Sequence, residues 1–125
     1  MIAKNITELI GNTPMIELKM KNNDWKVYLK LEKFNPGGSM KDRMALNMIN
    51  QAEKDGKLKP GGTIIESSSG NTAIGLAIAS AIKGYKFIAV VDHHASKEKI
   101  DMIKAYGGNI VVVGDGYKDN EVAVI

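Results

Sequence analysis

Lys41 is the residue whose position in the sequence most favours chemistry. It follows Ser39, a residue type preferred at the N-cap of a helix, so we expect Lys41 in a first helical turn. The same helix face carries Ala45, Met48 and Ala52, which we expect to be buried. Burial and the positive end of the helix macrodipole both disfavour the charged ammonium form. A lysine held uncharged can attack a carbonyl group and form a Schiff base. The alternative, a lysine that extends past the helix end into solvent, is far more common for a single lysine.

A run of small polar residues, SSSGNT at positions 67–72, forms the second candidate site. We expect it to connect a strand to a helix, where free backbone N–H groups bind anions and hydroxyl groups add further donors. In a parallel sheet such a turn lies beyond the carboxyl end of the strand, where ligands bind. The turn would therefore suit a carboxylate or a phosphate. Ordinary capping of the helix by Ser69 or Asn71 explains the same residues equally well.

Three other patterns carry less weight. Ser39 and Lys41 could form the pair of a serine–lysine hydrolase, but two residues are a weak signal. His93 and His94 follow a predicted strand, and because neighbouring side chains point apart, we expect a surface or site-rim position rather than joint metal binding. Gly114 and Gly116 lack the third glycine of a dinucleotide-binding sequence. The chain has no complete Walker sequence either.

The composition is that of an ordinary globular domain. The 125 residues are 44% hydrophobic and 25% charged, with a net charge of +3 that comes almost entirely from lysine. No basic run is interleaved with aromatic residues, so we expect no nucleic-acid partner. No apolar stretch approaches the roughly 18 residues that span a bilayer, and we expect no membrane partner. Without cysteine the chain has no disulfide, metal-binding thiolate or catalytic thiol. We expect a cytoplasmic protein, because residues 1–11 lack the apolar core of a signal peptide.

Strands and helices alternate after residue 62, which indicates an α/β fold. Continuous apolar strands separated by helices are typical of a parallel sheet covered on both faces. The helix that begins at Ser39 precedes this repeat and should end at Gly56. The expected strands are residues 63–66, 86–91 and 110–113, and the expected helices are residues 71–83 and 96–106.

The two ends of the chain do not fit this repeat. Residues 6–10 favour a short helical turn, and residues 15–19 and 25–31 favour a hairpin around Asn22, Asn23 and Asp24. The hairpin has no evident partner sheet. Residues 117–125 resemble the start of a helix that is cut off, so we expect the chain to be shorter than the fold it encodes.

Two sequence runs together closely resemble the cysteine synthase and cystathionine β-synthase family. They are NPGGSMKDR at residues 35–43 and ESSSGNT at residues 66–72, at the separation typical of that family. Residues 8–14 (ELIGNTP) and 59–63 (KPGGT) support the resemblance, which covers essentially the whole chain. Two specific motifs at this separation outweigh the solvent-exposed alternative for Lys41.

The resemblance implies a type II fold that binds pyridoxal 5'-phosphate (PLP). Lys41 would hold PLP as a Schiff base and later remove the α-proton of the substrate, and Asn71 would hydrogen-bond the ring hydroxyl of the cofactor. The implied reaction is a β-replacement on an activated L-serine, as in O-acetylserine sulfhydrylase (cysteine synthase), within cysteine biosynthesis. Relatives of this kind act on small amino-acid substrates and are usually homodimers. The residues that would hold the substrate carboxylate are Ser68, Ser69, Gly70 and Thr72.

The sequence also departs from the family. Ser68 stands where threonine is usual, and Ala73 where glycine is usual. The added methyl of Ala73 beside the carboxylate loop would narrow the site or stiffen its closure. Met40 and the pair Val91 and Asp92 are similar to siderophore-type enzymes that make a diaminopropionate precursor from O-phosphoserine. That reaction and a cystathionine β-synthase-like one remain alternatives. A non-enzymatic module that binds an anion at the serine-rich turn is a third.

The resemblance also divides the chain. Residues 1–35 would belong to a larger PLP domain that is mostly missing, and residues 36–125 would form the small α/β domain that carries the lysine. The phosphate-binding loop and the residue opposite the pyridine nitrogen would lie beyond Ile125. We therefore expect the 125-residue chain alone to be inactive and to bind PLP poorly or not at all.

Overall fold

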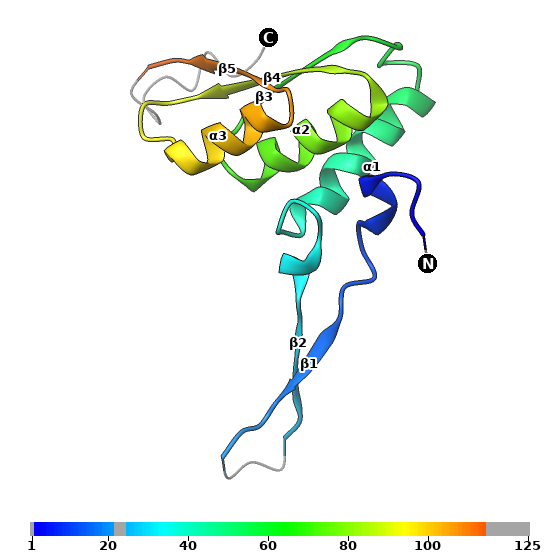
Figure 1. Ribbon diagram of the computed structural model, residues 1–125, viewed down its shortest axis with the longest axis vertical. Coiled ribbons are helices and arrows are strands. Elements are labelled where there is room, and N and C mark those ends of the chain that lie inside the picture. Colours follow the sequence, from blue (N-terminus) through cyan, green and yellow to red (C-terminus); the bar gives the residue numbers. More distant parts are fainter. Residues whose placement is uncertain (1, 22–24, 115–125) are drawn as a thin grey trace.

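The computed structural model describes residues 2–21 and 25–114, which form an α/β layer and a hairpin that protrudes from it (Figure 1). The first part comprises a 3-10 turn η1 (Ile6–Leu9), strands β1 (Met15–Leu18) and β2 (Val27–Lys30), and a 3-10 turn η2 (Glu32–Phe34). The α/β layer comprises α1 (Lys41–Lys54), β3 (Thr63–Ser67), α2 (Asn71–Lys83), β4 (Lys86–Val91), α3 (Lys97–Ala105) and β5 (Asn109–Val112).

The order of elements confirms the α/β prediction. The helix over 71–83 and the strand over 86–91 have the predicted bounds, and the other elements differ by one to three residues at their ends. Sequence patterns did not predict η2. The turn predicted at Asn22, Asn23 and Asp24 and the helix predicted from Tyr117 lie outside the described residues.

The sheet of the α/β layer has three parallel strands in the order β3-β4-β5. Ile65 pairs with Ile88, and Val90 pairs with Val111. Both crossovers advance in the same direction across the sheet, so crossovers of one hand place α2 and α3 on the same face. Figure 1 shows the helices on that one side of the strands.

The other face of the sheet corrects one prediction. It carries the apolar side chains Ile65, Ile88, Val90 and Val111, of which Ile65 is 47% and Val111 is 44% exposed. The expectation of a sheet covered on both faces is therefore wrong for the part of the chain that the structure describes. The physical reason is that two successive crossovers of the same direction cover only one face.

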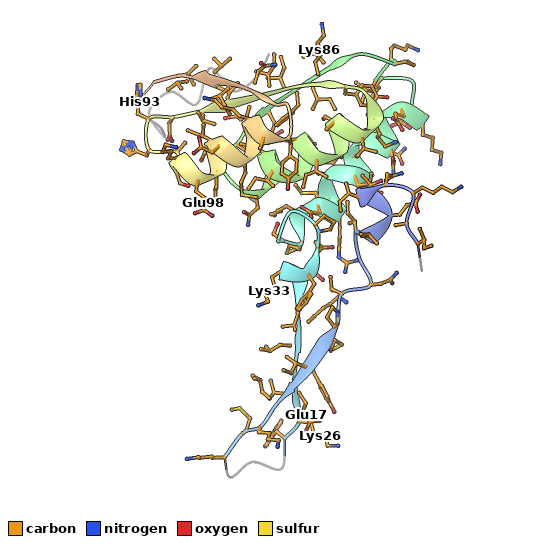
Figure 2. The ribbon with its side chains drawn as sticks, viewed as in Figure 1. Glu17, Lys26, Lys33, Lys86, His93 and Glu98 are labelled. Carbon is orange, nitrogen blue, oxygen red and sulfur yellow. The ribbon has the colours of Figure 1, made fainter. Side chains whose placement is uncertain are left out.

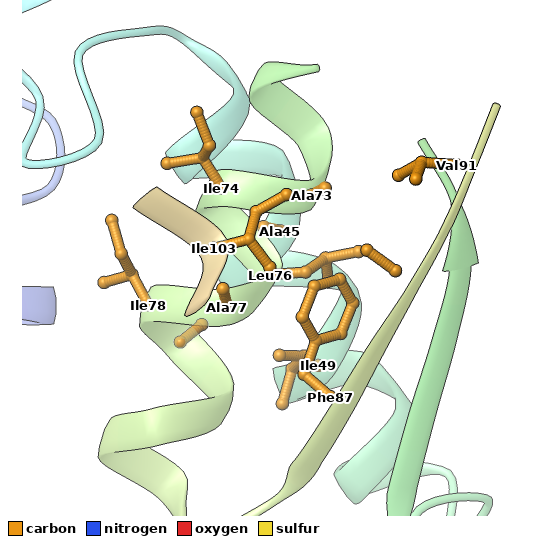
Figure 3. Packing of buried hydrophobic residues seen from close by; sticks show 12 residues of the cluster. Ala45, Ile49, Ala73, Ile74, Leu76, Ala77, Ile78, Phe87, Val91 and Ile103 are labelled. Carbon is orange, nitrogen blue, oxygen red and sulfur yellow. The ribbon is translucent and has the colours of Figure 1, made fainter. Parts of the chain in front are cut away.

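Helix α2 forms the centre of the core. All eight residues from 73 to 80 are buried, because α1 packs against one side of the helix and β4 against another (Figure 3). Phe87 on β4 and Ile103 on α3 close the cluster, each at most 2% exposed. A helix enclosed in this way needs no polar face, which explains why its sequence is apolar nearly all round.

Helix α1 buries a narrower stripe than its sequence suggested. Its buried residues are Asp42, Ala45 and Ile49, whereas Met48 is 45% exposed. The prediction that Met48 shares a buried face is therefore wrong. Lys41 lies at the margin of the stripe and is half-buried. The stripe is narrow because α1 lies against α2 alone over most of its length, as Figure 1 shows.

The hairpin of β1 and β2 extends away from the α/β layer. The two strands pair only with each other, with Met15 opposite Lys30, and all eight of their residues are exposed. In Figure 2, Glu17 and Lys26 mark the distant part of the hairpin, far from Lys86 and His93 on the layer. Its exposed large apolar side chains are Met15, Ile16, Leu18, Val27, Tyr28 and Leu29, with Met20 and Trp25 beside them.

Candidate functional site

The loop before α1 turns sharply and delivers Lys41 to the start of that helix. Gly38 has a positive φ of 79°, and its N–H donates to the carbonyl of Asn35 at 2.8 Å. Ser39 Oγ accepts the N–H of Lys41 at 3.1 Å, so Ser39 satisfies the first free donor of the helix although Met40 holds the N-cap position. The predicted place of Lys41 in the first turn is confirmed.

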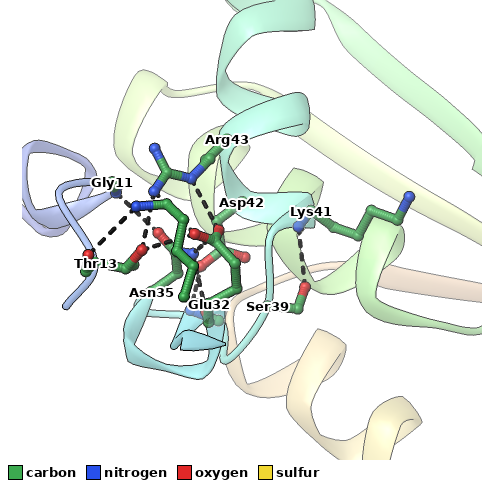
Figure 4. Close-up of polar contacts among 10 residues, drawn as sticks. Gly11, Thr13, Glu32, Asn35, Ser39, Lys41, Asp42 and Arg43 are labelled. Atoms are coloured by element: carbon green, nitrogen blue, oxygen red, sulfur yellow. Dashed lines mark hydrogen bonds and ion pairs between the residues drawn. The ribbon is translucent and has the colours of Figure 1, made fainter. Parts of the chain in front are cut away.

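The Lys41 side chain is not part of the polar cluster beside it. It extends away from Arg43 and Glu32 (Figure 4), and its amine has no hydrogen bond or ion pair with any other residue that the structure describes. Ser39 Oγ contacts the backbone N–H of Lys41 rather than the amine, so nothing here supports a serine–lysine dyad. An amine that forms no ion pair with the described residues is available to react with a carbonyl group.

The serine-rich turn leads into α2 without a side-chain cap. Gly70 occupies the N-cap position, and among the described residues the one side-chain hydrogen bond of the turn is the Gly70 N–H donated to Ser68 Oγ at 3.2 Å. Ordinary capping by Ser69 or Asn71, the alternative explanation of this run, is therefore not what the structure contains. Asn71 is exposed, and Ser68, Ser69, Gly70 and Thr72 are half-buried. The first N–H groups of α2 thus remain free for an anion.

Helices α1 and α2 run in the same direction, which brings these two features to one end of the layer. Near the beginning of both helices, a Cβ placed on Gly75 would lie 3.1 Å from the Lys41 carbonyl oxygen. Near their ends, Glu53 of α1 forms an ion pair with Lys83 of α2, with 2.8 Å between Oε2 and Nζ. Two helix N-termini, which favour negative charge, therefore meet the carboxyl end of β3, where ligands bind in parallel sheets, at the point where Lys41 begins its helix.

A polar cluster ties the N-terminal segment to the first turn of α1 (Figure 4). Glu32 accepts from Arg43 Nε at 2.9 Å and Nη2 at 3.0 Å, and from the Thr13 hydroxyl at 2.7 Å. Asn35, 3% exposed, donates to both the carboxylate and the carbonyl of Glu32 and accepts the Gly11 N–H at 2.8 Å. The guanidinium of Arg43 holds the pKa of Glu32 down to about 2, and Glu32 in turn raises the pKa of Arg43.

Asp42 is a second acidic group in this region, and its surroundings are opposite in kind. It is 1% exposed, and one carboxylate oxygen accepts the Gly37 N–H. The other oxygen, Oδ1, is buried and has no hydrogen-bond partner among the described residues. Burial therefore raises the pKa of Asp42, and the Gly37 hydrogen bond offsets only part of that effect.

The histidine pair lies at the carboxyl end of β4. Both side chains are exposed, and the backbone N–H of His94 donates to Asp92 Oδ1 at 2.8 Å. Ser96 then caps α3, with its Oγ accepting the Lys99 N–H at 3.3 Å, as predicted. Within the described ranges, no three histidine, aspartate or glutamate side chains gather in a group that could hold a metal ion.

The sequence and structure comparisons agree with this arrangement. Residues 6–125 match the family described as pyridoxal-phosphate dependent enzymes. The chain belongs to that family.

The relatives of this PLP-dependent chain are longer than it is. A putative cysteine synthase of Sinorhizobium fredii (strain NBRC 101917 / NGR234) is 51% identical over 125 residues, which are 100% of this chain and 37% of the relative. A hydrogen sulfide-producing enzyme of Fusobacterium nucleatum has a TM-score of 0.89 at 42% identity, over 94% of this chain and 39% of the solved one. O-ureido-L-serine synthase has a TM-score of 0.89 at 42% identity, over 98% and 39%.

The residues present fit the PLP of the family. A cofactor that is held through a carbonyl group needs an amine, and Lys41 supplies one at a helix N-terminus with no ion pair to any described residue. The uncapped start of α2 supplies donors for an anionic group. No helix in the described part of the chain is long and apolar enough to cross a bilayer.

Sequence patterns singled out the lysine and the serine-rich turn but missed the polar residues that surround the start of α1. Asp42 and Arg43 were noted only as part of the run at residues 35–43, and Glu32 was not noted at all. Arg43 is the single arginine of the chain and lies two residues after the lysine, which is a signal that could have pointed to the cluster. Its partners are 11 and 30 residues away in sequence, so no local pattern identifies them.

Proposed function

We propose that this chain is the lysine-bearing part of a cysteine synthase-like enzyme, which replaces the β-substituent of an activated L-serine by a sulfur nucleophile. One observation carries the proposal: Lys41, whose amine has no partner among the described residues, begins α1 at the end of the layer where α2 begins without a side-chain cap. Identity of 51% with a putative cysteine synthase over all 125 residues supports the same conclusion. The chain spans about 37% of that relative, so the reaction is proposed for the whole protein.

Each candidate residue has a proposed role. Lys41 Nζ would hold PLP covalently and, once released, accept the α-proton of the substrate. Bound PLP supplies the electron sink that makes this proton acidic. Asn71 would hydrogen-bond the ring hydroxyl of the cofactor. The hydroxyls that would hold the substrate carboxylate, together with the first N–H groups of α2, belong to Ser68, Ser69 and Thr72.

The hairpin supports a division into two domains. We propose that residues 1–35 join a larger domain and that residues 36–125 form the small one. All eight residues of β1 and β2 are exposed although most are apolar, and a surface of that kind favours burial against another part of a protein. That the whole protein is a cytoplasmic homodimer stays a prediction, which analytical ultracentrifugation and cell fractionation would check.

The first experiment tests the cofactor lysine. We expect the full-length protein that carries this chain to show, with PLP, the visible absorbance band of a lysine-bound cofactor. Lys41→Ala should abolish the band, whereas Lys104→Ala, at an exposed position of α3, should leave it unchanged. No band in the unmodified protein would favour a non-enzymatic anion-binding module. Labelling of Ser39 by a serine-directed reagent would favour a hydrolase.

The second experiment identifies the leaving group. Addition of O-acetylserine, O-phosphoserine or serine to the PLP-loaded protein should give the large spectral change of β-elimination, as distinct from the smaller change on amino-acid binding, only with a substrate that loses its β-substituent. We expect O-acetylserine to be the most effective. A preference for O-phosphoserine would point instead to the diaminopropionate-precursor reaction, and a preference for serine to a cystathionine β-synthase-like reaction.

The third experiment concerns the chain by itself. We expect residues 1–125 alone to show no β-replacement activity and little or no PLP binding, because the phosphate loop of the family lies outside them. An absorbance band of lysine-bound cofactor in this chain would contradict that expectation.

A further inference from the structure

We propose that Gly75 and Asp42 are positioning residues that hold the peptide between Lys41 and Asp42 from two sides and so set the direction of the Lys41 amine. The inference rests on the proposed role of Lys41 as the cofactor lysine. Neither Gly75 nor Asp42 would touch the cofactor or the substrate. Both would act through the backbone from which the Lys41 side chain extends.

Gly75 supports the peptide between Lys41 and Asp42 from the side of α2. It lies inside α2, where glycine is a poorer helix former than alanine, and its φ is not positive, so its backbone does not require glycine. A Cβ at this position would lie 3.1 Å from the Ala45 Cβ, 3.1 Å from the Lys41 carbonyl oxygen and 3.2 Å from the Asp42 Cα. Glycine therefore permits a close approach of α1, and two of the three contacts are with the backbone of residues 41 and 42.

Asp42 is the second side. Its carboxylate accepts the Gly37 N–H and is buried, with Oδ1 left without a partner in the described structure. A Cβ on Gly37 would overlap this carboxylate, so the loop also approaches as closely as glycine allows. A buried carboxyl with one unsatisfied oxygen destabilises a fold. The location of this costly group, one residue after Lys41, suggests that it holds the loop to the start of α1.

The Lys41 amine has no hydrogen bond or ion pair with the described residues that could fix its direction. Its backbone N–H is accepted by Ser39, and its carbonyl is closely approached by Gly75. Asp42 ties the next residue to the loop through the Gly37 N–H. A shift of this peptide moves the point from which the Lys41 side chain extends. Because misplacement of a reacting group by about 1 Å can cost about a hundredfold in rate, a smaller shift should still lower the rate of chemistry more than it lowers binding.

The test uses the PLP-loaded full-length protein, first shown to have the absorbance band of a lysine-bound cofactor that Lys41→Ala removes. Without that band the proposed function fails, whereas the positioning proposal is decided by the variants that retain it. Gly75→Ala should keep the covalent cofactor but change the circular dichroism of its band. It should lower kcat roughly tenfold while KM changes by less than about twofold.

The Asp42 variants give an independent test of the same support. Asp42→Asn keeps an oxygen that can accept the Gly37 N–H and should leave kcat within about threefold of the unmodified value. Asp42→Ala removes the acceptor and should lower kcat roughly tenfold, with the same change in the circular dichroism of the cofactor. Rescue by asparagine would show that the hydrogen bond, and not the negative charge, supports the loop.

Ser80→Ala is the matched control, because Ser80 is buried in the same helix and its hydroxyl has no partner among the described residues. It should change neither kcat nor the cofactor signal. If Gly75→Ala does not fold, Ala45→Gly combined with Gly75→Ala removes one of the three close contacts and takes its place. The proposal is overturned if the Gly75 and Asp42 variants lower only the unfolding temperature, or if Ser80→Ala changes the cofactor signal equally.

Discussion

The beginnings of α1 and α2 lie at the same end of the layer but are built in opposite ways. Around the start of α1 most polar groups of the described structure have a partner, the Lys41 amine and Asp42 Oδ1 being exceptions. Ser39 accepts the Lys41 N–H, Asp42 accepts the Gly37 N–H, and Arg43 binds Glu32. Around the start of α2 the N-cap Gly70 has no side-chain cap, and the hydroxyls of the serine-rich turn make a single contact. The start of α1 is held by contacts within the protein, whereas the start of α2 keeps its donors for a ligand.

This difference gives the two helix beginnings different proposed roles: the start of α1 would fix the geometry of the chain, and the start of α2 would bind a ligand. Groups that are satisfied within the protein stabilise one arrangement of the chain, whereas unsatisfied donors at a helix N-terminus gain most from a ligand. Substitutions at the start of α1 should therefore change stability and geometry. Substitutions at the start of α2 should change ligand affinity and leave stability nearly unaffected.

Two asparagines give the largest expected contrast. Asn35→Ala should lower the free energy of unfolding by about 2–3 kcal/mol, because at a buried position it leaves the Gly11 N–H without its partner and removes the side-chain donor to the carboxylate and carbonyl of Glu32. Asn71→Ala, at the exposed start of α2, should change it by less than about 0.5 kcal/mol. Urea unfolding of the cofactor-free protein measures both values. Equal losses would remove the distinction between the two helix beginnings.

The free end of α2 should respond in affinity. We expect Ser69→Ala or Thr72→Val to raise KM for the amino-acid substrate about tenfold, which corresponds to about 1.4 kcal/mol, because each removes one donor to the carboxylate. The urea midpoint should remain that of the unmodified protein. Steady-state kinetics with O-acetylserine at saturating PLP would measure the effect, and an unchanged KM would place the carboxylate elsewhere.

Acidic pH should destabilise the region around the start of α1, because it protonates Glu32. The pKa of Glu32 is lowered from 4.5 to about 2 in the folded protein, so its stabilisation is present above pH 4.5 and is lost as the pH falls towards 2. Glu32→Gln should lower the unfolding temperature by a few degrees at neutral pH, and this difference should vanish near pH 2. Thermal unfolding of both proteins across that range gives the comparison. A constant difference would show that the ion pair is not its source.

The smallest effect is expected at the far ends of the same two helices. Tyr85 donates its hydroxyl to Glu53 at 2.7 Å, and this hydrogen bond raises the pKa of Tyr85. Tyr85→Phe should lower the unfolding temperature slightly and leave KM and the cofactor spectrum unchanged. Because Glu53 also pairs with Lys83, the two helices stay connected in the variant. A change in the cofactor spectrum would show that the far ends also position Lys41.

The sequence predicted best where a segment is defined by its own residues. Helix α2 and strand β4 have the predicted bounds, since each is an apolar run that ends at a small or polar residue such as Gly84, whose φ is positive at 76°. The placement of Lys41 in a first turn followed from Ser39 in the same way. Local patterns suffice for these features because the interactions that define them are local.

Features that depend on distant residues were not predictable. Met48 continues the apolar pattern of α1, but only the position of α2 decides which face is buried. Ile65 and Val111 have the sequence of a covered strand, and only the direction of the crossovers leaves their face open. The contact of Arg43 with Thr13 spans 30 residues. The roles of Lys41 and the serine-rich turn towards PLP and substrate stay predictions until the variants are measured.

The protruding hairpin affects the risk that the polypeptide aggregates while it is being synthesised. Its strands are made before the α/β layer, and each has a free edge and an apolar surface when it leaves the ribosome. An edge of this kind can pair with another nascent chain. Lys19, Lys21, Lys26 and Lys30 lie along or beside the two strands, and their charges would keep such hairpins apart until they are covered. Replacing these lysines with neutral residues should therefore lower the soluble yield before it affects any property of the folded enzyme.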